Sequence, residues 1–251
     1  MVAAACVSLE GLNGGGAGPS IGEAGVDAPG TVDGAKAEGS TEAPDADAGS
    51  PSLAIGLLVR LTFDEGMGKT ARDLSGKGND GTLNGGATWG QGKHGSALSL
   101  NGADGYVRID PAVGLLFGDA FSVAVWLNLD TVAGDVRLVA KDSDWDLKLN
   151  GRQPQLTVGS AFAAALKPLP VNEWHHIVFT LFKTDCHTYF DGKLGLLQTN
   201  TIEAGVLLKQ DMLGMHVGSS AAPDDFAKGL IDDLRIYDRV LTDAEIAELA
   251  R

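Results

Sequence analysis

Apolar and polar residues alternate along most of the chain after residue 56. Val59, Leu61 and Phe63 alternate with polar neighbours, which is the period-two pattern of a strand with one buried face. The longest such run is 121–129, in which Phe121 and Val123 begin an apolar row. Further short segments of this kind lie at 81–83, 87–89, 97–100, 106–109, 136–141, 145–149, 155–158, 174–182, 187–190, 193–197, 213–217 and 229–237. Many short strands with Gly-rich turns between them predict an all-β sandwich or barrel.

Two local signals fix the ends of elements. Asn150-Gly151 separates two strand patterns and predicts a tight hairpin, because both residues tolerate the positive φ of its turn. Near the C-terminus, Thr242 and Glu245 have the spacing of a helix capping box. The sequence therefore predicts one short C-terminal helix after the last strand.

The last strand pattern, 229–237, contains an acidic residue at an unexpected place. Simple alternation puts Asp232 in the same row as Leu230, Leu234 and Ile236. A carboxylate pointed into packed hydrocarbon costs several kcal/mol, roughly, unless a cation or hydrogen-bond donors meet it. Two interpretations stay open: backbone N–H groups, or a bound calcium ion.

The first 52 residues have a different composition from the rest. Large apolar residues are sparse, and residues 7–52 carry eight acids and one base. Such a segment buries too little surface to offset its ordering entropy, so we expect residues 1–52 to be a disordered acidic linker and 53–251 to be the folded domain. The formal charge of the whole chain is −14, which argues against nucleic acid and anionic membrane surfaces as partners.

The segment before Cys6 consists of small residues and resembles the cleavage and lipidation box of bacterial lipoproteins. No basic and apolar signal regions precede it, so two interpretations remain. Either the natural start lies upstream and Cys6 is lipidated, or Cys6 is an ordinary thiol. We expect the first, with an extracellular or cell-surface location, as in an outer-membrane lipoprotein. No apolar run approaches the roughly 18 residues of a membrane-spanning helix, so only a lipid anchor would reach a membrane.

Seven motifs in order resemble one known family. They are Leu61-Thr-Phe-Asp-Glu65, the loop 73–83, the segment 95–107, Phe121-Ser-Val-Ala-Val-Trp126, Trp174-His-His-Ile-Val178, Tyr189-Phe-Asp-Gly-Lys193, and 229–246. Together they resemble the laminin G-like jelly-roll family, which is concanavalin A-like in architecture. The resemblance covers residues 53–251. It implies a two-sheet antiparallel jelly-roll sandwich, an extracellular location, structural calcium, and a role in binding carbohydrate or protein.

The same resemblance suggests a calcium site near the first and last strands. It would use the carboxylates of Asp64, Asp104 and Asp232 and the backbone carbonyls of Asn101 and Gly102. Calcium takes about six to eight oxygen ligands at about 2.3–2.6 Å, so this set fits its chemistry. In the alternative, Asp64 and Asp104 only stabilise turns.

Asp142, Asp144 and Asp146 stand at alternate positions and resemble the acids of jelly-roll glucanases. Those enzymes have Glu in the run, and this chain has none there. Glycoside hydrolysis needs two carboxylates at about 5–5.5 or 6.5–9.5 Å from each other. Because the run lacks Glu, we interpret it as an acidic loop or edge strand instead of a catalytic pair. We therefore predict no catalytic residue, and treat a glycoside hydrolase relative as the least favoured hypothesis.

Sugars stack on exposed aromatic rings while polar groups take their hydroxyls. The aromatic residues to consider are Trp89, Tyr106, Trp126 and Trp145. We predict that Trp145 with its neighbours Asp144 and Asp146, and Trp126, contact a ligand. The leading hypothesis is a non-catalytic bacterial module that binds glycan or matrix. The alternative is a protein–protein adhesion or assembly module on the same fold.

Overall fold

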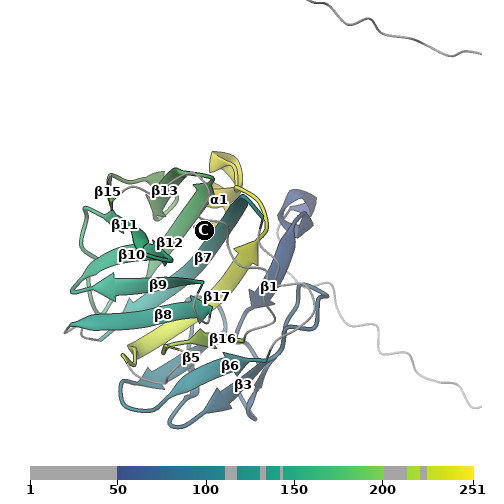
Figure 1. Ribbon diagram of the computed structural model, residues 1–251. Coiled ribbons are helices and arrows are strands. Elements are labelled where there is room, and N and C mark those ends of the chain that lie inside the picture. Colours follow the sequence, from purple (N-terminus) through teal and green to yellow (C-terminus); the bar gives the residue numbers. More distant parts are fainter. Residues whose placement is uncertain (1–49, 111–117, 131–133, 142–143, 201–213, 221–224) are drawn as a thin grey trace, which may run out of the picture. The chain divides into compact units, whose positions relative to one another are not determined.

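The computed structural model describes residues 50–110, 118–130, 134–141, 144–200, 214–220 and 225–251, without the side chains of 198–200 (Figure 1). The predicted lipidation site Cys6 and the acid Asp142 lie outside the described residues. So does almost all of the predicted linker, whose boundary at residue 52 stays a prediction. In the part of the chain that the structure describes, no helix is long and apolar enough to cross a membrane.

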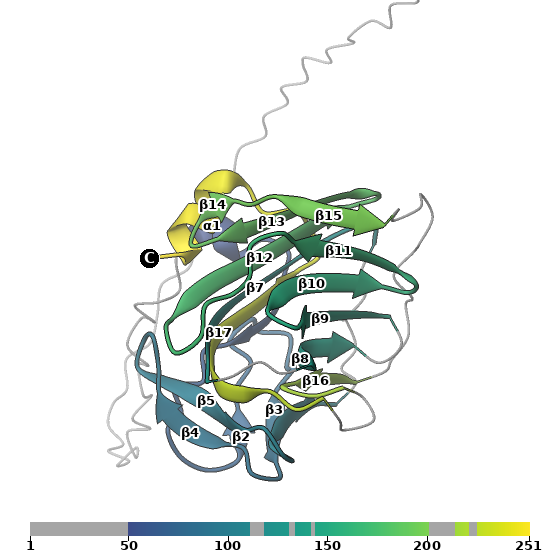
Figure 2. The same cartoon turned by 90° about the vertical axis from the view of Figure 1, so that its left-hand side faces the viewer.

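Two antiparallel sheets form the domain, which confirms the predicted sandwich (Figures 1 and 2). Sheet A has the strand order β14 (Lys193–Leu194), β13 (Asp185–Phe190), β12 (His175–Phe182), β7 (Ala120–Leu129), β17 (Lys228–Tyr237), β5 (Ser96–Asn101) and β4 (Thr88–Gln91), and β1 (Leu57–Leu61) also pairs with β17. Sheet B has the order β15 (Leu197–Asn200), β11 (Ala161–Ala165), β10 (Gln153–Val158), β9 (Trp145–Asn150), β8 (Asp135–Lys141), β16 (Met215–Val217), β6 (Tyr106–Ile109), β3 (Gly81–Asn84) and β2 (Thr70–Ala71).

The core lies between the two sheets and follows the predicted alternation. Val59, Leu61 and Phe63 are all fully buried there, as are Phe121 and Val123 of β7. The predicted turn at Asn150-Gly151 joins β9 to β10, and Gly151 has a φ of 60°. Local patterns thus set the inner faces of the strands correctly.

A second apolar cluster covers the outer face of sheet A. Two short helices pack on this face: the 3₁₀ helix η1 (Pro51–Ala54), which lies above β1 in Figure 1, and the helix α1 (Asp243–Leu249), which lies near the upper ends of β7 and β12. The cluster consists of Leu53, Leu57, Ala124, Val178, Tyr189, Tyr237, Leu241, Ile246 and Leu249. This part of sheet A is therefore buried on both sides.

β17 does not keep the simple alternation that the sequence predicts. Its register with β7 shifts between Asp232 and Arg235, and Asp233 has a φ of 40°. This is a β-bulge, which adds one residue and reverses the faces beyond it. Ile231 and Leu234 both point into the core, so Asp232 points to the outer face of sheet A. The prediction that Asp232 shares the row of Leu234 was wrong for this reason.

The bulge lies where β17 changes partner. Its first half pairs with β5, and its second half pairs with β1, while β7 follows the other edge. The first and last strands therefore come together, and they do so next to Asp232.

The predicted capping box of α1 is present. Thr242 Oγ1 accepts a hydrogen bond from the Glu245 backbone N–H, and the Glu245 carboxylate accepts one from the Thr242 N–H. Arg239 donates to both Glu245 oxygens, at 2.7 and 2.9 Å. These hydrogen bonds, those of Arg239 foremost, lower the pKa of Glu245 to about 2.

We predict that Glu245→Gln lowers the free energy of unfolding by about 1–2 kcal/mol at pH 7, because it removes the charge-assisted hydrogen bonds with Arg239 while the amide oxygen can still accept from the Thr242 N–H. A depressed carboxyl pKa stabilises the fold above the unfolded value near 4.5, and this stabilisation is lost as the pH falls toward 2. Urea unfolding of both proteins should therefore show a difference that shrinks below pH 4. Glu173→Gln, at a side chain 60% exposed, is the matched control. An equal loss in both variants would contradict the prediction.

Candidate functional site

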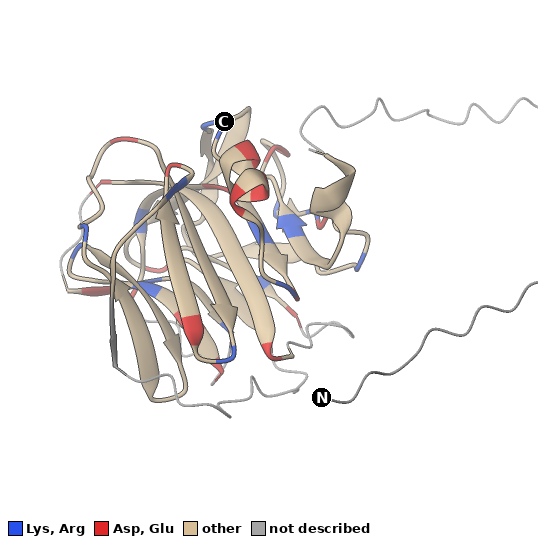
Figure 3. Cartoon of the chain, turned by 90° about the horizontal axis from the view of Figure 1, so that it is seen from above, with Lys and Arg blue, Asp and Glu red and all other residues tan. Residues whose placement is uncertain are grey.

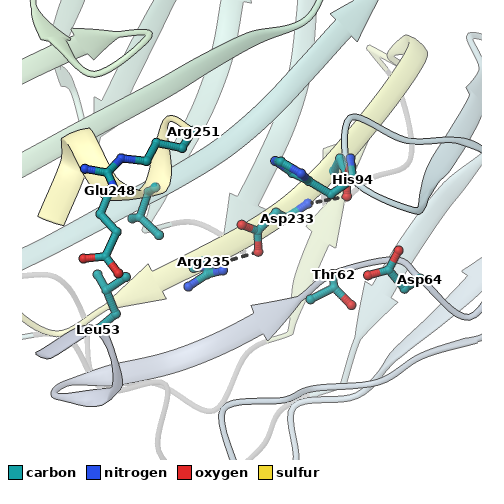
Figure 4. Close-up of a pocket in the computed structure, with 10 residues that line it drawn as sticks. Leu53, Thr62, Asp64, His94, Asp233, Arg235, Glu248 and Arg251 are labelled. Carbon is teal, nitrogen blue, oxygen red and sulfur yellow. Dashed lines mark hydrogen bonds and ion pairs between the residues drawn. The ribbon is translucent and has the colours of Figure 1, made fainter. Parts of the chain in front are cut away.

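A small acid-lined pocket lies on the outer face of sheet A, where the bulge of β17 meets the end of β1 (Figure 4). Its volume is about 180 Å³, and its wall includes Asp64, His94, Asp232 and Arg235. The tip of α1 closes one side through Glu248 and Leu249. A pocket of this size suits an ion or a few water molecules rather than a sugar ring.

Two of the pocket carboxylates, those of Asp64 and Asp232, accept hydrogen bonds from the turn between β4 and β5 and the start of β5. Asp232 Oδ2 accepts a hydrogen bond from the His94 backbone N–H at 3.0 Å, and Oδ1 accepts one from the Asp233 N–H at 2.8 Å. Asp64 Oδ1 accepts one from the Ser96 N–H at 2.8 Å. The turn approaches so closely that a side-chain carbon at Gly92 would lie 2.7 Å from Asp232 Oδ2. Backbone donors thus meet Asp232, as one of the two sequence interpretations expected.

The pocket disfavours the charged form of Asp232. This residue is 1% exposed, and burial raises the pKa of its carboxyl to about 7, with Asp233 and Asp64 as neighbouring negative charges. The two backbone hydrogen bonds oppose the shift in pKa. Asp233 is itself paired with Arg235, whose Nε lies 2.9 Å from its Oδ1 (Figure 4).

The five residues predicted to bind calcium do not form one site. Asn101 is the last residue of β5 and Gly102 and Asp104 follow it, whereas Ser96 and its partner Asp64 lie at the start of β5. At about 3.3 Å per residue the two groups are roughly 16 Å apart, far beyond one coordination shell. Among the described residues, no group of three or more His, Cys, Asp or Glu side chains is arranged to hold a metal ion.

Asn101 and Asp104 instead build a turn. Asn101 Oδ1 accepts hydrogen bonds from the backbone N–H groups of residues 103, 104 and 105, and its amide donates to Asp104 Oδ1 at 2.7 Å. Asp104 Oδ1 also accepts from the Gly86 N–H. The alternative that Asp104 stabilises a turn fits this geometry.

The predicted ligand contact at Trp126 was wrong. Trp126 is 4% exposed on the outer face of sheet A. Its indole N–H donates to the Leu249 carbonyl at 3.3 Å, the Lys93 ammonium lies 4.6 Å from its ring, and His176 packs against it at 5.1 Å. The turn between β4 and β5 and the end of α1 therefore cover it.

The prediction for Trp145 and Asp144 was also wrong. Trp145 is 3% exposed and packs on Phe121 in the core, because it shares the inner row of β9 with Leu147. The carboxylate of Asp144 has no exposed surface and lies 2.6 Å from Lys141 Nζ, which is equally buried. The acids beside Trp145 follow the alternation of the strand and do not mark an exposed ring.

Asp146 is the predicted ligand residue that lies on an outer surface. It belongs to a row of paired residues that crosses eight neighbouring strands of sheet B, from β2 to β11. At about 4.8 Å per strand the row is roughly 34 Å long. Its members are Thr70, Thr82, Arg108, His216, Ala140, Asp146, Thr157 and Phe162. Their chain neighbours point into the core, so the row faces outward.

Charged and aromatic groups flank this row. Arg137 Nε lies 3.2 Å from Asp146 Oδ2, and its Nη1 lies 3.2 Å from Asp225 Oδ2. Burial raises the pKa of Asp146, and Arg137 opposes the shift. Near the middle of the row, Tyr106 of β6 packs against His216 and Phe226 with ring centroids 5.6 and 6.4 Å away. We call the row with Tyr106, Arg137, Lys148, Gln155, Asp225 and Phe226 the sheet-B surface.

The sheet-B surface combines partly exposed rings with hydroxyl and charged groups, while Gln155, His216 and Ala140 within it are buried. Tyr106 was among the aromatic residues considered from the sequence, but Arg137, Asp225 and Phe226 were missed. Their only sequence signal is alternation with apolar neighbours, and this signal does not say which outer face stays uncovered.

The chain matches a family model described as the concanavalin A-like lectin/glucanases superfamily over residues 101–247. The chain belongs to this superfamily. No curated protein matches this chain.

Several solved structures share this fold. Domain 4 of AbnA, an extracellular arabinanase of Geobacillus stearothermophilus in complex with arabinotriose, has a TM-score of 0.61 and 23% identity, covering 78% of this chain and 98% of that one. The binding domain of botulinum neurotoxin DC, in complex with rat synaptotagmin II, has a TM-score of 0.60 and 14% identity over 79% of this chain and 52% of that one. A structure of botulinum neurotoxin type C has a TM-score of 0.61 and 13% identity, covering 79% of this chain and 51% of that one. Cell entry of that toxin depends on interaction with two ganglioside molecules.

We predict that Asp232 makes stability depend on pH. Its folded pKa near 7 lies above the ordinary value of 3.8, so its stabilising contribution is full below about pH 4 and is lost as the pH rises through 7. Relative to Asp232→Asn, the wild type should lose about 1–3 kcal/mol between pH 4 and 7.5 in the presence of EDTA. Urea unfolding at four pH values measures this. Asp104→Asn changes the charge equally and should show no such trend; parallel curves for the wild type and Asp232→Asn would refute the prediction.

Proposed function

We propose that this protein is a non-catalytic extracellular module that binds carbohydrate through the sheet-B surface, displayed on the cell surface by a lipid at Cys6. The observation that carries the proposal is the outward row of polar and aromatic residues from Thr70 to Phe162. The row is about 34 Å long. Six of its eight members are exposed or half-buried, an extent that suits an extended chain of sugar units better than a small ligand.

The chemistry of this surface fits sugar recognition. The rings of Tyr106 and Phe226 lie together beside His216, near the middle of the row, and offer apolar faces for the C–H groups of a sugar. Further along, the buried Gln155 amide donates to Thr157 Oγ1 at 3.2 Å and orients this half-buried hydroxyl beside Asp146. Hydroxyl and carboxylate groups held in this way are suited to sugar hydroxyls.

The contacts of Asp144 and Asp146, the two acids of the alternating run that lie in the described part of the chain, support a non-catalytic role. Asp144 is buried against Lys141, and Asp146 is engaged by Arg137. A general acid and a nucleophile each need access to the glycosidic bond, and Asp144 has no exposed surface. The structures with the same fold that contain arabinotriose or involve gangliosides add support for a glycan partner.

A specific feature favours an extracellular protein as the second candidate partner. Leu166, Leu194 and Leu196 are 46, 64 and 76% exposed and line one groove with Phe190. Exposed apolar groups that cluster are typical of protein contact sites. The relative with rat synaptotagmin II in its complex is an example of this fold with a protein partner.

We predict that Tyr106→Ala weakens glycan binding about tenfold, which corresponds to the loss of about 1.4 kcal/mol of ring stacking. The measurement is a glycan array followed by calorimetry on the best ligand. Phe182→Ala is the matched control, because Phe182 is 50% exposed on β12 of the other sheet. Equal binding by the wild type and Tyr106→Ala would remove the sheet-B surface from the proposal. No glycan signal at all would favour the protein partner.

The calcium prediction is retained for Asp64 and Asp232 alone, which line one pocket as neighbouring negative charges. We expect about 1 mM CaCl₂ to raise the melting temperature at pH 7.5 by a few degrees relative to EDTA, because an ion that binds only the folded state stabilises it. Asp64→Asn should abolish the rise, and Asp104→Asn should keep it. No rise in the wild type would mean that the two carboxylates serve only the turn between β4 and β5.

A further inference from the structure

The basic side chains of the sheet-B surface each have a carboxylate partner nearby. Arg137 lies between Asp146 and Asp225, Lys148 Nζ is 3.4 Å from Asp135 Oδ2, and Arg108 Nε is 2.9 Å from Asp110 Oδ1. These three bases face four acids, so the surface carries a small excess of negative charge. The formal charge of the whole chain, −14, has the same sign.

Arg137 is the basic group held most firmly. Its side chain is 22% exposed, and its two carboxylate partners approach the guanidinium from different sides. Asp225 also fixes the backbone, because its carbonyl accepts a hydrogen bond from the Arg137 N–H at 3.0 Å. Asp225 has a φ of 49°, a conformation that non-glycine residues adopt rarely. The backbone hydrogen bond and the conformation of Asp225 therefore hold this residue next to Arg137.

An anionic sugar needs N–H groups that are free to pair with its carboxylate or sulfate. At Arg137 these groups already face Asp146 and Asp225, so an anionic ligand would have to displace a carboxylate. The displaced carboxylate would then stay close to the ligand and repel it, in a partly buried place where screening is weaker. A neutral sugar meets neither obstacle, since hydroxyl groups can donate to the same carboxylates.

We propose that the sheet-B surface selects uncharged glycans, and that Asp225 and Asp146 exclude carboxylated and sulfated ones by occupying Arg137. This inference rests on the proposed glycan-binding function and adds the class of ligand. Asp225 is a specificity-determining residue in this account. Tyr106 and Phe226 supply stacking for either class of sugar, so they do not decide the charge preference.

The test compares binding of neutral and anionic oligosaccharides to the full chain by calorimetry. The neutral probes are arabino-, xylo- and cello-oligosaccharides, and the anionic probes are oligogalacturonates and heparin-derived oligosaccharides. We expect the wild type to bind a neutral probe and to bind the anionic probes at least tenfold more weakly. Asp225→Asn should strengthen binding of an anionic probe about five- to tenfold, since it removes one competing charge worth about 1 kcal/mol. Binding of the neutral probe should not strengthen, because the amide keeps only one of the two carboxylate oxygens to which a sugar hydroxyl can donate.

Asp185→Asn is the matched control, because it makes the same change of charge at a side chain 70% exposed on sheet A. Asp146→Asn is a second variant that frees Arg137 from its other partner, and melting temperatures confirm that each variant folds. Anionic binding stronger than neutral binding in the wild type would overturn the inference and leave the proposed function standing. So would equal gains in Asp225→Asn and Asp185→Asn. No glycan binding by the wild type would overturn both.

Discussion

The bulge at Asp232 and Asp233 is the constraint on which the architecture of this domain depends. β17 pairs with β7 along one edge, and β5 and β1 share its other edge. One extra residue at the change of partner reverses the faces of β17, so Leu234 still points into the core while Asp232 points outward. The first strand, the last strand and the turn before β5 then meet at the Asp232 carboxylate, whose two oxygens accept backbone N–H groups.

The two outer faces of the sandwich are covered to different extents. On sheet A, η1, α1 and the turn between β4 and β5 cover the middle strands and bury Trp126. On sheet B, six of the eight members of the outward row are exposed or half-buried, while His216 and Ala140 are buried. Because a two-layer fold buries its inner faces in any case, the elements added to one outer face decide where a ligand can be bound. Figure 3 shows α1, with its acidic residues, seen from above.

Many acids of this chain stabilise the fold rather than act in chemistry. Asp232 holds a turn, Asp144 neutralises Lys141, and Glu245 joins Arg239 to the start of α1. Each is largely buried and has a specific partner, as the cost of burying an isolated charge requires. An acidic residue in a strand pattern is thus weak evidence for a metal or a catalytic group. The contacts of the carboxylate decide its role.

The sequence by itself determined the all-β class, the inner rows such as Val59 to Phe63, the turn at Asn150-Gly151, and the cap at Thr242, because periodicity, turn chemistry and capping act over a few neighbouring residues. The two-sheet sandwich was implied by the family resemblance, and the strand pairing confirms it. Only the tertiary structure decided the face of Asp232, since a bulge depends on which strands pair on either side. It also decided that Trp145 is buried and that Asn101 and Asp104 lie far from Asp64. Whether an outward side chain meets solvent, a helix or a carboxylate depends on segments distant in the sequence, and local pattern carries no information about them.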